Sequence, residues 1–301
     1  MRYLLATPLA ALAVYTYHAT STPISAPVRQ MLIASNHWHS GCPVPLSGLR
    51  VFTTTYWGFD KRTHTGQMVV NAHAVAPLTI VFRKLYAMRF PIRHMQLSDI
   101  YGKVPADGDV TASMECRNAV PSPCNGGSTS TGHWSMHAYG LAVDIDPEWN
   151  PHRHNVSGPV IFSAQPSQAG RQQEVAAGIA GTAFTPGQVA AVEAIRTVDG
   201  LQVFGWGGRW RSSHDAMHFE IRLTPAELRR GLSSLPGPTG QTDEAAGHAT
   251  CTGCEADADA GEFAGEFEDA SAWEDAAGHS RWGLYDQLAL GWGQAEEAGN
   301  D

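Results

Sequence analysis

The sequence predicts an α+β domain in which helices flank a small antiparallel sheet. Residues 49–57 are rich in β-branched and aromatic side chains, and 67–70 repeat this composition beyond a glycine-containing turn, so both segments are expected to be strands. Apolar residues then recur at helical spacing from 74 to 90 before a proline, which predicts a core helix. Strands and helices are interspersed without a regular strand–helix–strand repeat, and this irregular order favours an antiparallel sheet.

Five further elements are expected in the rest of the domain. A strand is expected at 95–101, and a helix at 188–198, where valine and isoleucine recur on one face. Residues 203–208 and 217–221 are both strand-like and are expected to pair with each other. A short last helix is expected at 225–232.

The N-terminal residues are expected to precede the folded domain. Residues 1–26 start with one positive charge and an apolar run too short to span a bilayer comfortably, which is typical of a signal peptide or N-terminal anchor. Small residues near Ala19 and Ala26 offer cleavage sites, and a buried strand or helix of the domain is the alternative. Residues 27–40 lack a periodic apolar pattern and are expected to be a linker. No other segment could span a membrane.

The remaining chain is expected to divide into a folded domain, 41–235, and an acidic tail, 236–301. The formal charge of the whole chain is -9, but residues 239–301 hold 15 of its 29 acidic and only one of its 20 basic residues. The rest of the chain is therefore mildly basic, which suits an anionic polymer such as a cell wall. The tail is expected to be disordered because it cannot bury enough apolar area, although its aromatic residues could form a short docking helix.

Five cysteines leave the disulfide pairing open. Cys116 and Cys124 are close enough in sequence to close a small loop, and this is the pair that we expect if the chain is exported. Cys42 could replace either partner. Cys251 and Cys254 lie in the polar tail, where no second pair accompanies them.

Two separated motifs together predict a metal site. In the first, His137 and Asp144 are seven residues apart, and Gly140 between them allows the backbone to bend so that both side chains face one ion. Alternation along a strand places Asp144 and Asp146 on one face, so spacing alone leaves either carboxylate eligible as the ligand. In the second motif, 215–220, the order is reversed, and His218 lies three residues after the carboxylate of Asp215.

A catalytic zinc ion requires three protein ligands and an open fourth position. Two histidines and one carboxylate, namely His137, Asp144 and His218, meet this requirement. Most of the other histidines are expected to make ordinary polar contacts and are given no role: His37, His39, His64, His73, His94, His133, His152 and His154.

The two motifs resemble the signature of a known family. Ser135-x-His137-x-x-Gly140-x-Ala142-x-Asp144 followed by Asp215-x-x-His218-Phe219-Glu220 is similar to the zinc peptidase family of D-alanyl-D-alanine carboxypeptidases and phage-type L-alanyl-D-glutamate endopeptidases. The resemblance covers residues of roughly 40–232 and extends to Cys116-Arg117, Asn150-Pro151, 204–208 and Trp210. It implies the hedgehog/DD-peptidase type of zinc fold.

The resemblance also implies roles for individual residues. His137, Asp144 and His218 would bind Zn2+, and Asp215 would be the general base that takes a proton from water and passes it to the leaving amine. Arg117 would stabilise the oxyanion. The alternatives are that Arg117 binds the substrate carboxylate or only stabilises its own loop.

Three further residues are expected near the site. Ser135 and Glu220 are expected to bind substrate or to orient the ligands. His214 could assist the base or could be an exposed loop residue.

The function implied is a secreted or cell-wall-associated zinc peptidase, acting as a monomer without nucleic acid and without a membrane span after signal cleavage. Its substrates would be peptidoglycan stem peptides, cut at L-Ala-D-Glu or at D-Ala-D-Ala, and the aspartate at the base position favours the endopeptidase. There are two alternatives: a wall-binding module that keeps zinc without catalysis, and a phage endolysin.

Overall fold

Small antiparallel sheets and a few helices make up the α+β fold, as predicted. The computed structural model describes residues 16–119, 134–154, 183–210 and 213–233. The predicted acidic tail, 236–301, therefore lies outside the described residues. Within these residues, no helix is both long and apolar enough to cross a membrane.

The first sheet is organised around strand β2 (Leu49–Gly58), which corresponds to the first predicted strand. It pairs antiparallel with β1 (Ala19–Pro23) on one side and with β3 (Thr63–Asn71) on the other. The two-residue strand β4 (Pro91–Ile92) adds a parallel pairing at the end of β2. Strand β3 contains the second predicted strand and extends it in both directions.

The N-terminal part of the chain belongs to the fold, which corrects the expectation that 27–40 is a linker and that the domain begins at 41. Helix α1 (Ala26–Ala34) buries Val28 and Leu32, which are one helical turn apart. Two buried residues are too few to produce a clear periodic pattern in the sequence. Cleavage near Ala26 would remove β1 from the sheet, so the fold and the second candidate cleavage site conflict.

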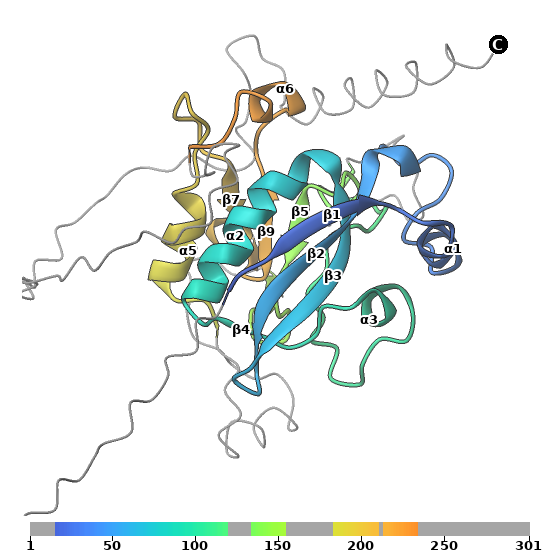
Figure 1. Cartoon of the computed structure of the whole chain (residues 1–301), viewed down its shortest axis with the longest axis horizontal. Coiled ribbons are helices and arrows are strands. Elements are labelled where there is room, and N and C mark those ends of the chain that lie inside the picture. Colours follow the sequence, from blue (N-terminus) through green and yellow to red (C-terminus); the bar gives the residue numbers. More distant parts are fainter. Residues whose placement is uncertain (1–15, 120–133, 155–182, 211–212, 234–301) are drawn as a thin grey trace, which may run out of the picture.

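Helix α2 (Val75–Ala87) confirms the predicted core helix and lies along the first sheet, with α5 beside it (Figure 1). Its Phe82 ring lies 5.9 Å from that of Phe52 on β2. The strand predicted at 95–101 is wrong, because α3 (Leu97–Tyr101) forms there. Asp99 in its first turn favours a helix through the interaction of a carboxylate with the free N–H groups.

The second sheet carries one part of each motif. Its strand order is β5 (Ala142–Asp144), β9 (His218–Ile221) and β7 (Phe204–Trp206), and both pairings are antiparallel. The predicted pairing of 203–208 with 217–221 is thus confirmed. A separate two-stranded sheet joins β6 (His152–His154) to β8 (Ser213–Asp215).

The remaining helices are short. Helix α5 (Pro186–Glu193) and helix α6 (Pro225–Leu228) lie where helices are predicted, but both end earlier than expected. Each begins with a capping box, formed by Thr185 and Gln188 in α5 and by Thr224 and Glu227 in α6. Three 3-10 turns complete the described elements: η1 (Leu46–Gly48), η2 (Ala72–Ala74) and η3 (Gly207–Arg209).

Aromatic side chains join the first half of the chain to the second sheet. The rings of Phe90 and Phe184 stack at 4.4 Å, and Phe184 meets Phe219 of β9 edge-on at 5.1 Å. Such pairs stabilise a core beyond the area that they bury. The second sheet is therefore held rigidly against the part of the chain that precedes it.

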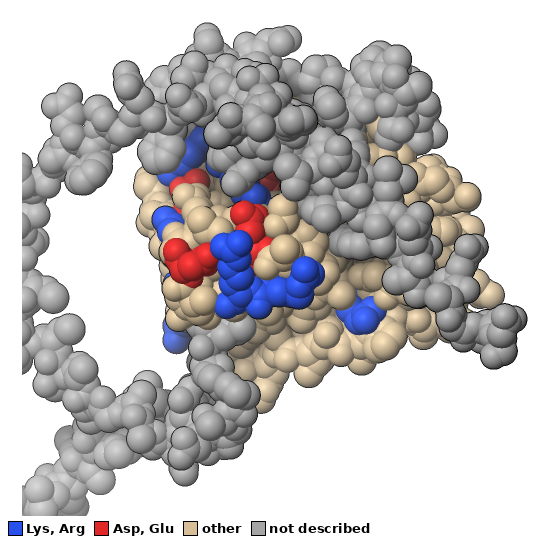
Figure 2. Space-filling model, turned by 90° about the horizontal axis from the view of Figure 1, so that it is seen from above, with Lys and Arg blue, Asp and Glu red and all other residues tan. Residues whose placement is uncertain are grey.

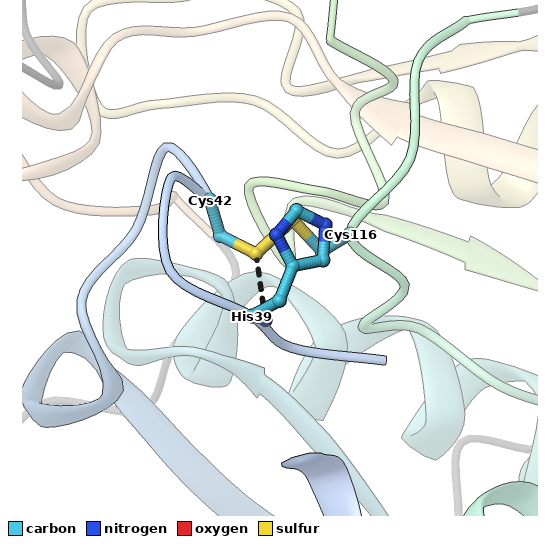
Figure 3. A group of neighbouring side chains, drawn as sticks. All are labelled: His39, Cys42 and Cys116. Atoms are coloured by element: carbon cyan, nitrogen blue, oxygen red, sulfur yellow. Dashed lines mark hydrogen bonds between the residues drawn. A yellow bond between two sulfur atoms is a disulfide. The ribbon is translucent and has the colours of Figure 1, made fainter. Parts of the chain in front are cut away.

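The disulfide joins Cys42 to Cys116 and not Cys116 to Cys124, which corrects the expected pairing (Figure 3). Cys124, Cys251 and Cys254 lie outside the described residues. His39 lies beside the bridge, and its backbone N–H donates to Cys42 Sγ at 3.1 Å. Since the two sulfur atoms are bonded to each other, this group is no metal site in the oxidised protein.

Cys42→Ser is expected to lower the free energy of unfolding by about 2–4 kcal/mol, because the bridge closes a long loop in the unfolded chain. Chemical denaturation under oxidising conditions measures the change. Cys124→Ser is the matched control and should leave the Cys42–Cys116 bridge and the stability unchanged. Equal stabilities of Cys42→Ser and the parent would show that this bridge does not form.

Candidate functional site

The first motif is anchored to the end of strand β3. Gly140 has a φ of +62°, and a Cβ atom there would lie 2.7 Å from the backbone nitrogen of Asn71. That nitrogen donates to the Gly140 carbonyl at 2.9 Å, while Asn71 Nδ2 donates to the Tyr139 carbonyl, also at 2.9 Å. Glycine is thus required both for the backbone conformation and for the close approach, and the turn that carries His137 is held in place.

Three side chains from the two motifs converge on one point. His137 Nε2 lies 3.1 Å from His218 Nδ1 and 3.2 Å from Asp144 Oδ1, and His218 Nδ1 lies 3.1 Å from the same Asp144 oxygen. The β5–β9 register places Asp144 directly opposite His218, so the sheet itself brings these two together. His137 and His218 are buried, and Asp144 is partly buried.

The outer nitrogens of both imidazoles have acceptors. His137 Nδ1 lies 2.6 Å from the Ser113 carbonyl oxygen, and His218 Nε2 lies 3.1 Å from Glu220 Oε2. A carbonyl and a carboxylate can only accept, so each of these nitrogens carries the N–H. In the neutral rings the inward nitrogens then present lone pairs, which is the usual way in which a protein orients histidine ligands.

The inward atoms therefore form a triangle of three acceptors with edges of 3.1–3.2 Å. Ligands about 2.0–2.1 Å from a tetrahedral zinc ion lie about 3.3 Å from one another, so the triangle is close to the face that such an ion needs. Three acceptors at this separation repel one another unless a cation lies between them. The residues present fit a metal ion of the zinc type.

Without a metal ion, a proton on His218 supplies the positive charge that the triangle needs. Burial disfavours a charge on His218, yet hydrogen bonds to Asp144 and Glu220 outweigh it and raise the pKa of His218 to about 10. Burial also opposes ionisation of Asp144, but the two histidines hold the pKa of that carboxyl well below its usual range. The site thus favours an ionised carboxylate together with positive charge beside it.

Asp146 does not share the position of Asp144, contrary to the expected alternation. Strand β5 ends at Asp144, and Asp146 has a φ of +44°. Its Oδ1 accepts from the backbone N–H of Arg93 at 3.0 Å and from the Thr111 hydroxyl at 3.4 Å. Burial and the nearby Asp109 raise its pKa well above the usual range. Asp146 therefore supports the turn that follows β5 and does not join the three converging side chains.

Asp215 ends strand β8 and lines the same cavity as the two histidines, a space of about 230 Å3. A Cβ atom on Gly207 would lie 2.7 Å from the Asp215 carbonyl oxygen and 3.1 Å from His218 Cβ, so glycine lets η3 pack against both residues. Burial and the charge of Asp144 raise the pKa of Asp215. A carboxylate with a raised pKa in a cavity is suited to proton transfer.

The other expected site residues also line this cavity: Arg117, Ser135 and Glu220. Arg117 Nε donates to Glu115 at 2.7 Å, so its alternative role in holding its own loop is compatible with the geometry. Ser135 Oγ accepts from the His137 backbone N–H at 3.3 Å and helps to hold the turn.

Three residues of the site were given no role from the sequence. Ser113 orients His137 through its carbonyl, which no side-chain pattern could reveal. Trp210 lines the cavity, and its ring lies 5.1 Å from that of His218. His152 also lines the cavity, although it had been given no role. His214 is buried and lies opposite Arg153 in the β6–β8 pair, so it is not an exposed loop residue.

Comparison with known proteins agrees with the motifs. Residues 128–221 match the family model described as D-alanyl-D-alanine carboxypeptidase. No curated protein and no solved structure matched the chain. The matched segment contains His137, Asp144, Asp215 and His218, whereas Arg117 lies outside it. The resemblance drawn from the two motifs is thereby confirmed for the segment that carries them.

Proposed function

We propose that the protein is a zinc peptidase that hydrolyses an amide bond involving a D-amino acid in peptidoglycan stem peptides. The observation that carries the proposal is the triangle of acceptor atoms on His137, Asp144 and His218, which opens into the cavity lined by Asp215. The match of this segment to a peptidase family supports the reaction class. We propose further that the fold is of the hedgehog/DD-peptidase type.

His137, Asp144 and His218 would hold the zinc ion. When bound, zinc supplies Lewis acidity and lowers the pKa of water in the site towards about 7. Ser113 and Glu220 would keep the two imidazoles oriented by accepting from their outer nitrogens.

The protein's own groups would perform the proton transfers. Asp215, as a carboxylate, would remove a proton from the attacking water while the water oxygen bonds to the peptide carbonyl carbon. The protonated Asp215 would then give this proton to the amide nitrogen as the carbon–nitrogen bond breaks, so that an acid and an amine leave. Arg117 at the cavity wall would stabilise the negative oxygen or hold a substrate carboxylate.

The two candidate bonds differ in what the cavity must hold. An aspartate at the base position favours the L-Ala-D-Glu bond, whereas an arginine free to hold a terminal carboxylate would suit D-Ala-D-Ala. Arg117 donates to Glu115 through Nε, and its outer nitrogens can serve either substrate, so the preference for the endopeptidase rests on the aspartate.

Digestion of purified muropeptides with the zinc-loaded chain tests the proposal. Mass spectrometry distinguishes loss of a terminal D-alanine from separation of L-alanine from the remaining stem. We expect the second product, and Asp215→Asn serves as the control for contaminating peptidases. Binding of peptidoglycan without cleavage of either bond would favour the wall-binding module, and D-alanine release alone would correct the bond.

We also propose a monomer that is secreted or associated with the cell wall and binds stem peptides but no nucleic acid. The Cys42–Cys116 bridge supports an oxidising compartment. On the face seen in Figure 2, basic and acidic side chains lie next to one another, which does not favour a polyanion such as nucleic acid. Sequencing the N-terminus of extracellular protein tests export, and an intact Met1 would contradict signal cleavage.

The activity is expected to decline on the acidic side as Asp215 is protonated. The base must be ionised, and burial together with Asp144 raises its pKa. The acidic limb should therefore lie above pH 4, the ordinary range of a carboxyl being about 3.9. A profile of kcat/KM against pH measures it, since this ratio reports the free enzyme. A kcat/KM that does not fall with pH anywhere on the acidic side, in protein that stays folded and zinc-loaded, would exclude Asp215 as the base.

A further inference from the structure

The candidate base has a histidine as its cross-strand neighbour. His152 is the first residue of β6, and the β6–β8 register places it directly opposite Asp215. Residues directly opposite in an antiparallel pair have Cβ atoms about 4.5–5.5 Å apart and project from the same face. The two side chains are therefore within reach of each other.

This shared face is the wall of the candidate active site. His152 and Asp215 both line the cavity with the two histidine ligands, whereas the next pair in the register, Arg153 and His214, is not part of its lining. Side chains alternate between the two faces of a strand, which explains this separation. The short β6–β8 sheet thus presents one histidine and one carboxylate to the site.

The hydrogen bonding of the Asp215 carboxylate indicates a role for His152. Its Oδ1 atom is buried and has no hydrogen-bond partner among the residues that the structure describes. A buried carboxylate oxygen without a donor is costly, and a carboxylate free to rotate is a poorly placed base. The nearby His152 also acts electrostatically on Asp215, lowering its pKa against the effect of burial.

We propose that His152 is a positioning residue for Asp215. A ring N–H of His152 donates to Oδ1 of Asp215 in the working site and holds the carboxylate so that its other oxygen faces the attacking water. The catalytic consequence rests on the proposed peptidase function, but the contact between the two side chains does not.

Kinetics of zinc-loaded variants test the consequence. His152→Ala is expected to lower kcat about 10- to 100-fold with little change in KM, which is the usual effect of losing a residue that orients a catalytic group. The acidic limb of the pH profile should move to higher pH. Of His152→Asn and His152→Gln, the one whose amide N–H replaces the donating ring nitrogen should restore most of kcat. Arg153→Ala, on the opposite face of β6, is the matched control and should behave as the parent.

Thermal denaturation of the metal-free full chain tests the contact without any activity. The variants are His152→Ala, Asp215→Ala and the double variant. We expect the Tm shift of the double variant to differ from the sum of the two single shifts, since the effects of substituting residues in contact are not additive. The same cycle with His64→Ala, at the far end of β3 from Asn71, should be additive. Non-additivity without peptide hydrolysis would support the contact and contradict only the peptidase function.

Three results would overturn the proposal. Additive Tm shifts for His152 and Asp215 would show that the side chains do not interact. An unchanged kcat in His152→Ala would show that the interaction does not position the base. Loss of zinc from His152→Ala would mean that the histidine acts on the metal site and not on Asp215.

Discussion

Asp215→Asn is expected to retain zinc and the fold but to lose about 10²- to 10⁴-fold in kcat, the usual contribution of a general acid–base group. The amide keeps the shape of the carboxylate and cannot accept the proton from water. Asp215 is not among the three acceptor atoms of the metal site, so zinc content should remain that of the parent. Steady-state kinetics on muropeptides and metal analysis of the same preparations measure both effects.

A distant carboxylate provides the control for the loss of a negative charge. Asp199 is exposed and pairs with Arg230 at 2.7 Å, away from the residues that line the cavity. Asp199→Asn should have the parent's kcat. If Asp215→Asn also kept full activity, the base would have to be another group, and the mechanism proposed above would be wrong.

Replacing a metal ligand is expected to have the other large effect. Asp144→Asn and His218→Ala should each lose zinc on dialysis and reduce activity by at least about 10³-fold, because the ion contributes several kcal/mol to stabilising the transition state. Asp144→Asn tests the charge with little change in shape. His218→Ala removes a nitrogen ligand of the metal. It also leaves Glu220 without the imidazole to which it is hydrogen-bonded. Metal content after dialysis is the primary measurement.

His64→Ala is the matched histidine control. His64 pairs with Asp60 at the surface and does not line the cavity, so its removal should leave the zinc content unchanged. Added zinc should restore activity to chelated parent protein but not to the ligand variants. Retention of equimolar zinc by both ligand variants would show that the triangle of acceptors is not the metal site.

The sequence predicted secondary structure correctly where an element is long enough to show its characteristic composition or periodicity. Strand β2 and helix α2 are long enough for composition and periodicity to identify them, and both are confirmed. Helix α3 has only five residues, and the strand predicted at 95–101 was wrong. Helix α1 buries only two side chains, and the linker predicted at 27–40 was also wrong. Such short elements are stabilised by tertiary contacts, which local patterns do not show.

The disulfide illustrates the limit of sequence distance as a guide. Cys116 is eight residues from Cys124 and 74 residues from Cys42 in the sequence. Its disulfide partner is nevertheless the distant Cys42. Pairing depends on which residues the folded chain brings together. The backbone hydrogen bond from Cys116 to His37 shows that these two segments lie side by side in the fold.

By itself, the sequence determined the two motifs, the types of side chain that can hold a metal, and the similarity of their segment to a peptidase family, because residue identity and local spacing carry this information. Only the tertiary structure decided that three acceptor atoms lie within 3.2 Å of one another, that Asp146 points elsewhere and that His152 faces Asp215. These relations arise from strand register and backbone conformation between segments far apart in the chain. No local pattern encodes them, since each depends on contacts that exist only once the whole domain has folded.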